Sequence, residues 1–408
     1  MRWPTAKLSE ICIFDRGLTY TKSDEVNFDG TPVLRANNID LAKNRLDLSD
    51  IRYISSNVVV PNSKRTKKGA LLICTASGSK AHLGKVAYID DAIGWAFGGF
   101  MGQITAKPSV DSRYLYYILI SEAFRTHLEK RSDGVNINNL KFSDIEDFAV
   151  PLPPLTEQQR IVAILDEAFA GIAKATANAE RNLANARELL EGFLAAFFQR
   201  REPGWRDRQL KDICLRITVG HVGSMANRYT ETGIPFLRSQ NVRPFQIDLD
   251  NVVYIDKTFH SELGKSSLSA GDVAIVRTGY PGTAAVIPEN LGIANCSDLV
   301  IMRPGPEVQA RFLVAFFNSS FGKRLVSGKL VGAAQKHFNV GAAKDTVLHL
   351  PSLPDQQAFV ERVDELREYV KRLEEIAFSK ASLLQSMRQR LLHQAFSGSL
   401  TGKEATAA

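Results

Sequence analysis

The chain has 408 residues, of which 44% are hydrophobic, and a formal net charge of +7. This length predicts two or more domains, and the composition excludes a disordered chain. No apolar run is long enough to span a membrane, and the opening segment MRWPTAKLSEICIF lacks the apolar core of a signal peptide. Four cysteines without paired spacing argue against disulfides and zinc. We expect a soluble cytoplasmic protein whose charge favours a polyanionic partner.

Residues 1–152 alternate short apolar runs with Gly, Asn, Asp and Pro turns, a pattern typical of a mixed α/β domain. The runs ALLICTA (70–76) and KVAYID (85–90) predict strands, and residues 111–130 predict one amphipathic helix. Basic residues in this region are candidates for phosphate contacts, with an ordinary solvated face as the alternative. They are Lys64, Arg65, Lys67, Lys68, Lys130 and Arg131.

The segment 153–200 predicts one long helix over 156–198, after a proline-rich lead-in. Thr156 is a plausible N-cap, and Gln159 would complete a capping box. Apolar and small residues recur in steps of four and three, as in a coiled-coil seam. The predicted seam includes Ile161, Leu165, Ile172, Ala179, Asn182, Leu189 and Phe193.

Residues 201–352 repeat the first domain. Trp205, Leu210 and Ile213 match Trp3, Leu8 and Ile11 at a constant offset of 202. IPFLRSQNV (234–242) matches TPVLRANNI (31–39), and the runs DVAIVR (272–277) and DLVIMRP (298–304) predict strands. A helix is predicted over 307–326. The shared order indicates a duplication. The corresponding basic residues are Lys323, Arg324, Lys329, Lys336 and His337.

The segment 353–398 predicts a second long helix, with Asp355 as a plausible N-cap and a disordered tail at 399–408. Asn182 and Lys380 occupy equivalent seam positions and would set the register of a helix pair. The predicted seam is Phe359, Val363, Leu366, Val370, Leu373, Lys380, Leu384, Met387 and Leu391.

A helical apolar stripe can also be ordinary core. A helix over 156–198 would nevertheless be roughly 60 Å long, more than the width of a domain of this size. We therefore expect the two helices to pair antiparallel. The predicted fold class is α+β, with two mixed α/β domains separated by an antiparallel two-helix coiled coil and related by a pseudo-twofold internal repeat.

Two related domains at a set spacing suit two half-sites on DNA. Arg35, Asn37 and Asn38, with Arg238, Gln240 and Asn241, have side chains that grip guanine or adenine, although residues shared by both domains favour a structural or phosphate-binding role. The unmatched loops 75–85 and 277–285 are better candidates for base contacts, with an ordinary hairpin as the alternative. Their candidate residues are Ser77, Ser79, Lys80, Lys85, Arg277, Thr278 and Tyr280.

Catalytic motifs are not found in the sequence. The segment GSKAHLGKV (78–86) fails as a P-loop, because it has one residue too many between its glycines and Val86 where Ser or Thr is needed. No metalloprotease or nucleophile-elbow motif occurs, and the histidines show no metal-ligand spacing. Cys12 and Cys214 are most simply core residues. We expect neither a catalytic residue nor a metal site.

The proline, Gln-Gln and long-helix unit, VPLPPLTEQQRIVAILDEAF and LPSLPDQQAFVERVDEL, resembles the specificity subunits of type I restriction-modification enzymes. The family-like openings WPTAKLSEI and WRDRQLKDI and the ending LLHQAFSGSLT extend this similarity over the whole chain. The second unit departs from the usual form, since PDQQ replaces PLTEQQ.

The resemblance implies two target-recognition domains, each reading half of a bipartite site in double-stranded DNA. It also implies that two modification (methyltransferase) subunits dock on the helices and that restriction/translocase subunits join them. S-adenosylmethionine, ATP and Mg would then serve only the partner subunits, and no membrane would be involved. Two other hypotheses remain: a coiled-coil scaffold whose heads bind proteins, and a self-contained nuclease or methyltransferase.

Overall fold

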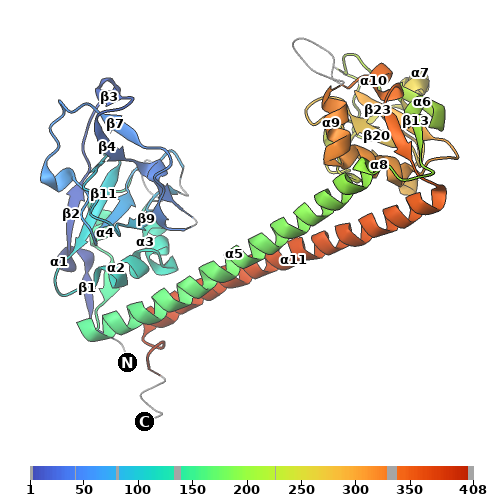
Figure 1. Ribbon diagram of the computed structural model, residues 1–408. Helices are drawn as coiled ribbons and strands as arrows, with labels where there is room; N and C mark the ends of the chain where they lie inside the picture. Colours follow the sequence, from blue (N-terminus) through green and yellow to red (C-terminus); the bar gives the residue numbers. More distant parts are fainter. Residues whose placement is uncertain are drawn as a thin grey trace. The chain divides into compact units, whose positions relative to one another are not determined.

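The computed structural model describes residues 3–41, 43–79, 82–132, 139–225, 227–328 and 338–402. The chain forms two compact units, one of Met1–Asn178 with Ser379–Ala408 and one of Ala179–Phe378. Each unit contains one mixed α/β domain and parts of two long helices, α5 (Leu155–Gln199) and α11 (Leu353–Ser397) (Figure 1). Among the helices in the described ranges, none combines the length and apolarity needed to cross a bilayer.

The first domain is built around two four-stranded sheets, with strand orders β2-β11-β8-β9 and β10-β4-β7-β3. Its strands are β1 (Thr5–Lys7), β2 (Cys12–Arg16), β3 (Glu25–Val26), β4 (Thr31–Leu34), β5 (Ile39–Asp40), β6 (Arg45–Leu46), β7 (Arg52–Ile54), β8 (Leu71–Cys74), β9 (Val86–Tyr88), β10 (Ala96–Phe97), β11 (Met101–Ala106) and β12 (Ala149–Pro151). Its helices are α1 (Leu8–Ile11), α2 (Ser112–Leu119), α3 (Glu122–Ser132) and α4 (Phe142–Glu146).

The second domain repeats this plan, with strand orders β14-β23-β20-β21 and β18-β15-β22-β19. Its strands are β13 (Arg206–Gln209), β14 (Cys214–Val219), β15 (Ile234–Leu237), β16 (Val242–Arg243), β17 (Gln246–Ile247), β18 (Val253–Ile255), β19 (Ser267–Leu268), β20 (Val273–Val276), β21 (Ala284–Val286), β22 (Ala294–Cys296), β23 (Leu299–Pro304) and β24 (Val347–Leu350). Its helices are α6 (Leu210–Ile213), α7 (Lys257–Glu262), α8 (Ala310–Asn318), α9 (Ser320–Gly328) and α10 (Val340–Lys344).

The corresponding sheets of the two domains pair their strands in similar ways, which supports the duplication. In both domains the long strand, β11 or β23, pairs antiparallel with two neighbours, and a short parallel pair, β4 with β10 or β15 with β22, organises the other sheet. The four strands predicted from their apolar runs are confirmed as β8, β9, β20 and β23. Cys12 is buried and Cys214 is half-buried, and burial raises the pKa of both thiols to about 12.

One predicted helix is broken in each domain. Instead of a single amphipathic helix, residues 112–132 form α2 and α3, and residues 310–328 form α8 and α9. The hydroxyl of Ser121 donates to the carbonyl of Ile118 (2.6 Å), and the equivalent Ser319 donates to Phe316 (2.6 Å). Each serine oxygen also accepts a backbone N–H from the next helix, so it acts as a helix-starting cap.

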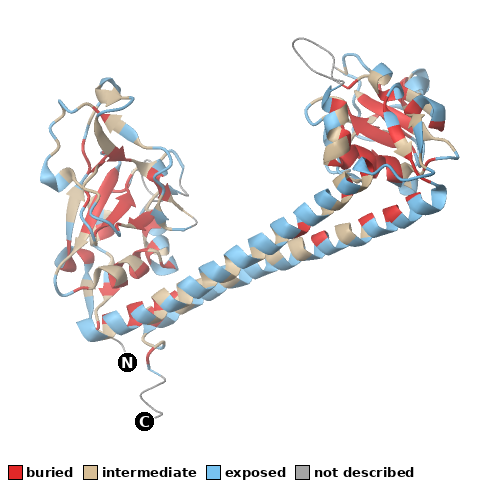
Figure 2. Cartoon of the chain, viewed as in Figure 1, coloured by how far each residue is buried: buried red, intermediate tan, exposed pale blue. Residues whose placement is uncertain are grey.

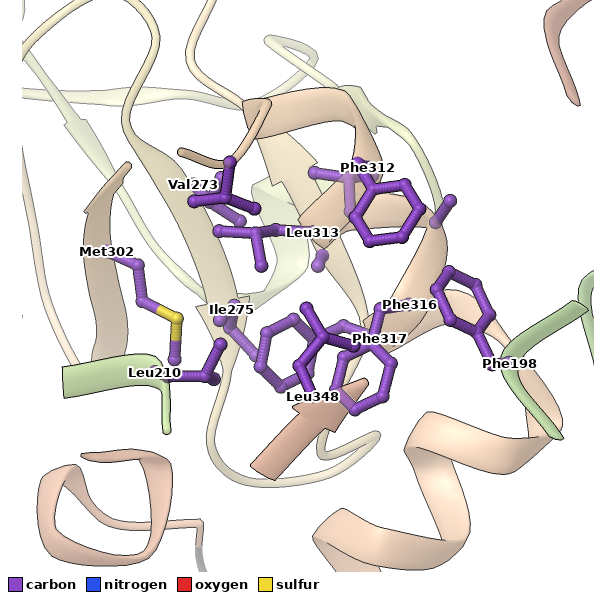
Figure 3. Packing of buried hydrophobic residues seen from close by; sticks show 14 of the residues in the cluster. Phe198, Leu210, Val273, Ile275, Met302, Phe312, Leu313, Phe316, Phe317 and Leu348 are labelled. Atoms are coloured by element: carbon purple, nitrogen blue, oxygen red, sulfur yellow. The ribbon is translucent and has the colours of Figure 1, made fainter. Parts of the chain in front are cut away.

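The core of each domain is completed by the ends of both long helices. In the second domain, Phe198 of α5 packs with Phe312 and Phe316 of α8, in a cluster that also contains Met302 of β23 on its opposite side (Figure 3). Phe359 of α11 joins the same cluster. In the first domain, the corresponding ends supply Ile161 and Leu165 from α5 and Leu392 and Ala395 from α11.

The two long helices run antiparallel within each unit. In the first unit, the guanidinium of Arg388 on α11 lies 5.0 Å from the ring centre of Phe169 on α5, and burial lowers the pKa of this arginine. In the second unit, Arg187 pairs with Glu374 (2.6 Å), and the rings of Phe197 and Phe359 stack with centres 3.8 Å apart. The helix positions therefore run in opposite directions along the contact.

The burial of the long helices (Figure 2) agrees with the predicted seam at most positions and differs at four of them. Asn182, Leu189, Lys380 and Met387 are exposed, whereas Leu183 and Leu190 are half-buried. A strict 3.5-residue stripe drifts by about 20° per heptad around a straight α-helix, so the buried face of α5 moves to neighbouring residues. Because both polar residues face solvent, Asn182 and Lys380 do not set the register. The remaining predicted positions are buried or half-buried: Ile161, Leu165, Ile172, Ala179, Phe193, Phe359, Val363, Leu366, Val370, Leu373, Leu384 and Leu391.

The helix starts and the C-terminal end also differ from the predictions. Because α5 begins at Leu155 and α11 at Leu353, Thr156 and Asp355 lie inside the first turns. Ser352 precedes α11; its hydroxyl donates to the Asp355 carboxylate (2.7 Å) and accepts the Asp355 N–H (3.3 Å). Thr401 is buried and donates to Glu157, so the described part of the predicted tail, 399–402, is ordered against the first domain.

The Gln-Gln motif explains how each domain is fixed to its helix. Gln158 is fully buried, and its side-chain oxygen accepts the backbone N–H of Asp111 (2.8 Å) just before α2. Its amide nitrogen donates to the carbonyls of Ser109 (3.2 Å) and Pro153 (2.9 Å). One side chain therefore joins the start of α5, its proline lead-in and the start of α2.

The second domain uses the same clamp at an offset of 198. Gln356 is fully buried, accepts the N–H of Gln309 (3.0 Å) and donates to the carbonyls of Glu307 and Pro351 (both 3.0 Å). An ion pair accompanies each clamp, Arg113 with Asp166 (3.0 Å) and Arg311 with Asp364 (2.6 Å). The second glutamine of each motif is exposed, so the first one carries the structural role.

Candidate nucleic-acid interface

The loops shared by both domains use their asparagines to hold themselves together. Asn38 is buried; its oxygen accepts the Arg35 N–H (2.8 Å), and its nitrogen donates to the carbonyls of Asp47 and Asp50 (both 2.9 Å). Asn241 is also buried and repeats this arrangement with Arg238 (3.0 Å) and Asp248 (2.9 Å). Because both amides are buried and bonded to the loop backbone, the predicted DNA contacts by Asn38 and Asn241 are contradicted by the structure.

The arginines of the same loops are partly committed to the fold. Arg35 pairs with Asp50 (3.4 Å), and Arg238 donates to the carbonyl of Asn251 (2.8 Å). Both side chains are only partly exposed. Their neighbours Asn37 and Gln240 are exposed, and Asn37 donates to Asp50 (3.1 Å). A DNA contact by these four residues stays a prediction.

The basic cluster of the first domain is mostly tied to the protein. Lys64 donates to the carbonyl of Arg16 (2.6 Å), Arg65 donates to that of Gly94 (3.0 Å), and Lys67 pairs with Asp15 (3.3 Å). Lys68 is exposed, and no partner is found for it in the described part of the chain. It is therefore the member of this cluster best placed to meet a phosphate.

The basic residues of α3 and α9 also differ in their surroundings. In α3, Lys130 is exposed, whereas Arg131 pairs with Asp147 (3.0 Å). Hydrogen bonds from Lys7 and Arg131 hold the pKa of Asp147 below its usual value. In α9, Lys323 is half-buried, and exposed Arg324 lies over the ring of Phe321. The predicted contacts Lys329, Lys336 and His337 lie outside the described residues.

The first unmatched loop loses one of its candidates. Lys85 is only 6% exposed, and its amine donates to the carbonyl of Ile39 (2.8 Å) and to His82 (3.3 Å). Burial lowers its pKa, which is what desolvation does to a buried amine. The predicted DNA contact by Lys85 is therefore contradicted by its burial. Its amine instead fixes the base of the loop to the carbonyl of Ile39. Ser77 is half-buried and Ser79 exposed at the loop surface, and Lys80 lies outside the described residues.

The second unmatched loop presents an aromatic ring. Arg277 and Thr278 bind the carboxylate of Asp298, at 2.7 and 2.6 Å. Beyond them, Tyr280 is 84% exposed. The ring of Tyr280 is therefore accessible to a partner of this loop.

An exposed aromatic residue in the first domain escaped prediction. Phe100 is 71% exposed, and its carbonyl accepts the N–H groups of Thr75 (2.9 Å) and Ala76 (3.2 Å) from the first unmatched loop. It lies just before β11, as Asp298 lies just before β23. In the sequence, Phe100 is marked only by the two glycines before it, Gly98 and Gly99. No motif indicates that this turn contacts the first unmatched loop.

The long helices carry apolar side chains outside their mutual contact. In the first unit, Leu383 (70% exposed) and Met387 (50%) lie on α11. In the second unit, Tyr369 (54%), Ile376 (58%) and Phe378 (80%) lie on α11, and Leu189 (58%) lies on α5. Exposed apolar residues repeated along helices mark a surface that another protein can cover.

Comparison with known proteins gives one consistent result. The family model described as "Type I restriction modification DNA specificity domain" matches residues 2–180. The chain is 25% identical to the type I restriction enzyme EcoKI specificity subunit of Escherichia coli K12, over 98% of this chain and 90% of that protein. It is 26% identical, with the same coverage, to the StySPI specificity subunit of Salmonella potsdam.

Solved structures share the fold. A chain from work on "complex assembly and conformational transition of the type I R-M system" superposes with a TM-score of 0.77 at 18% identity, covering 98% of both chains. The HsdS subunit from Thermoanaerobacter tengcongensis gives a TM-score of 0.60 at 18% identity, covering 98% of this chain and 97% of that one. Residues 2–180 thus match a type I restriction-modification DNA specificity domain, and the chain over nearly its whole length is similar to specificity subunits of type I restriction enzymes.

Proposed function

We propose that the chain is the non-catalytic subunit that gives a type I restriction-modification complex its DNA sequence specificity. Each domain would read one half of a bipartite target. One observation carries this proposal: the two domains share their clamps and sheets but differ in the loops after β8 and β20. We call these loops, 75–85 and 277–285, the reading loops. Two domains that are attached in the same way but carry different reading loops suit two half-sites of different sequence.

The helices would set the spacing of the two half-sites. Each has 45 residues, which corresponds to roughly 65 Å of α-helix. Their exposed apolar residues, such as Ile376 and Leu383, would be covered by two methyltransferase subunits. This division of labour leaves methyl transfer from S-adenosylmethionine to those subunits, and ATP- and Mg-dependent steps to restriction/translocase subunits.

Methylation mapping tests the proposal directly. The full chain is expressed with its neighbouring methyltransferase subunit in cells that lack other DNA methylation, and modified bases are mapped at single-nucleotide resolution. The expected result is one split motif with a constant spacer. Methylation without sequence preference would refute the proposal, as would a purified complex whose DNA affinity does not fall with rising salt. The latter result would favour a protein-binding scaffold.

An insertion in α5 tests the spacing role separately. Four residues added after Ala179, matched by four after Phe378 on α11, lengthen both helices by about one turn. The expected motif keeps both half-sites but accepts a longer spacer. The same insertion in α5 alone is the mismatched control and should impair assembly. An unchanged spacer with full methylation would contradict the spacing role while leaving half-site reading intact.

A further inference from the structure

The base of the second reading loop is held by one carboxylate. Asp298 directly precedes β23 with a φ of 49°, the left-handed region that Asp tolerates better than most residues. Its N–H donates to the carbonyl of His221 (3.1 Å), which fixes the backbone. The carboxylate then accepts from Arg277 Nη1 (2.7 Å) and Thr278 Oγ1 (2.6 Å). Two successive loop residues are thus tied to one side chain.

Arg277 is anchored a second time. Its Nε donates to the carbonyl of Phe338 (3.2 Å), and its own carbonyl accepts the Phe338 N–H (3.3 Å). The side chain is 13% exposed. Two of the five N–H donors of this guanidinium are bonded, its charge is paired with Asp298, and the side chain is largely buried, so little of it is available to guanine.

The rest of the loop is a tight hairpin. The N–H of Val276 donates to the carbonyl of Thr283 (2.8 Å), and that of Gly282 donates to Val276 (3.0 Å). Gly279 and Gly282 have φ of 85° and 90°, which only glycine adopts easily. Tyr280 therefore projects from a closed turn. Within the described residues, its ring makes no hydrogen bond or aromatic contact.

We propose that Asp298 is a positioning residue for the half-site read by the second domain: it withholds Arg277 and Thr278 from DNA, so that Tyr280 is the side chain this loop presents to the bases. The inference rests on the proposed function. A phenol ring can stack on a base or contact a thymine methyl group, and its hydroxyl can bond a base edge. A free arginine here would instead favour guanine or phosphate.

In the described part of the first domain, no carboxylate holds the loop in this way, so that domain serves as an internal control. Phe100 occupies the position equivalent to Asp298, and there the loop is held by the backbone carbonyl of Phe100. Substitutions at Asp298, Arg277 or Tyr280 should therefore change recognition at one half-site only.

The test compares five variants of the full chain in complex with its methyltransferase subunits: D298A, R277A, the double variant D298A/R277A, Y280A and Y280F. Binding to specific and unrelated DNA duplexes is measured between low and moderate salt, and methylation is measured on targets mutated in either half-site. Thermal unfolding checks that each variant is folded.

We expect D298A and R277A to reduce discrimination at the second half-site about tenfold, but to change non-specific binding in opposite directions. D298A frees a cation, so non-specific affinity rises and the log–log salt slope steepens by about 0.9. R277A leaves an unpaired carboxylate, so non-specific affinity falls. The double variant returns non-specific binding toward wild type without restoring discrimination. Y280A, an exposed substitution that should not affect folding, loses discrimination about tenfold, and Y280F loses less.

Three outcomes overturn the inference while leaving the proposed function intact, provided that the wild-type protein reads both half-sites. In the first, D298A and R277A shift non-specific binding in the same direction, as the loss of a purely structural ion pair would. In the second, Y280A retains full discrimination. In the third, Y280A loses discrimination equally at both half-sites. Wild-type protein that shows no sequence preference would overturn the proposed function itself, and the inference with it.

Discussion

The two domains are alike where they are attached and different where they face outward. Both are clamped by a buried glutamine and an arginine–aspartate pair, both break the same helix with a serine, and both close a loop around a buried asparagine. The shared pairs are Gln158 and Gln356, Asp166 and Asp364, Ser121 and Ser319, and Asn38 and Asn241.

The difference lies at the base of the reading loops. Phe100 holds the first loop through its backbone and leaves its ring free, whereas Asp298 holds the second loop through its side chain and leaves Tyr280 free. Because the backbone carbonyl of Phe100 makes the contact with the loop, any side chain could stand at this position, and the ring is available for recognition. After duplication, selection can therefore change a reading surface without disturbing the clamps that attach the domain.

The largest effect is expected at the clamp, because it is common to both domains. Gln356→Leu leaves the Gln309 N–H and the carbonyls of Glu307 and Pro351 without their partner, at a cost of about 3 kcal/mol in the free energy of unfolding. Chemical denaturation measures this loss. Gln357→Leu is the matched control, since that neighbouring residue is exposed.

The first domain should respond in the same way. Gln158→Leu is expected to destabilise the protein about as much as Gln356→Leu, and Gln159→Leu is its control. The hydrogen-bond partners of the two buried glutamines match one for one. A clear loss of unfolding free energy for only one of the two variants would therefore show that the two clamps are not equivalent.

A smaller effect is expected from the helix contact and tests its corrected register. Leu190 packs against the core of the second domain, whereas Leu189 is 58% exposed. Leu190→Ala should cost about 2 kcal/mol in unfolding free energy, and Leu189→Ala less than about 0.5. The 3.5-residue seam predicts the reverse order. Equilibrium unfolding of the two variants distinguishes them.

Sequence patterns predicted the parts that depend on local periodicity. The runs around Leu71–Cys74 and Val273–Val276 are buried strands, and both long helices exist where apolar stripes continue without proline. Seam positions such as Asn182 and Leu189 failed because repeats of 3.5 and 3.6 residues per turn give similar patterns at first and diverge along a long helix.

The reading surface could not be found in this way. Lys85 looked exposed because it lies in a glycine-rich polar loop, yet its amine turns inward to a carbonyl from β5. The role of Gln158 depends on carbonyls far away in the chain, and that of Asp298 depends on a left-handed backbone. These are tertiary hydrogen bonds, and no spacing rule encodes them.

The exposed ring of Phe100 extends the comparison to the loop of the first domain. Phe100→Ala should reduce discrimination at the first half-site about tenfold and leave the second unchanged, because only a ring is lost and the backbone contact remains. Methylation of targets mutated in each half-site measures this. Phe28→Ala is the control, since Phe28 is 79% exposed but lies in the turn between β3 and β4, which belong to a different sheet from β8. Equal losses for both variants would argue against a reading role for Phe100.

The smallest effect concerns two lysines of the first domain that look alike in sequence. Lys68 is exposed without a partner in the described part of the chain, so Lys68→Met should remove at most one phosphate contact and flatten the log–log salt slope by about 0.9. Lys85→Met should leave that slope unchanged, because the Lys85 amine is buried against the Ile39 carbonyl and does not meet the DNA ion atmosphere. Any loss from Lys85→Met should appear as lower thermal stability. Titration of the assembled complex with unrelated duplexes over a range of salt separates the two, and a flattened slope for Lys85→Met would return that residue to the interface.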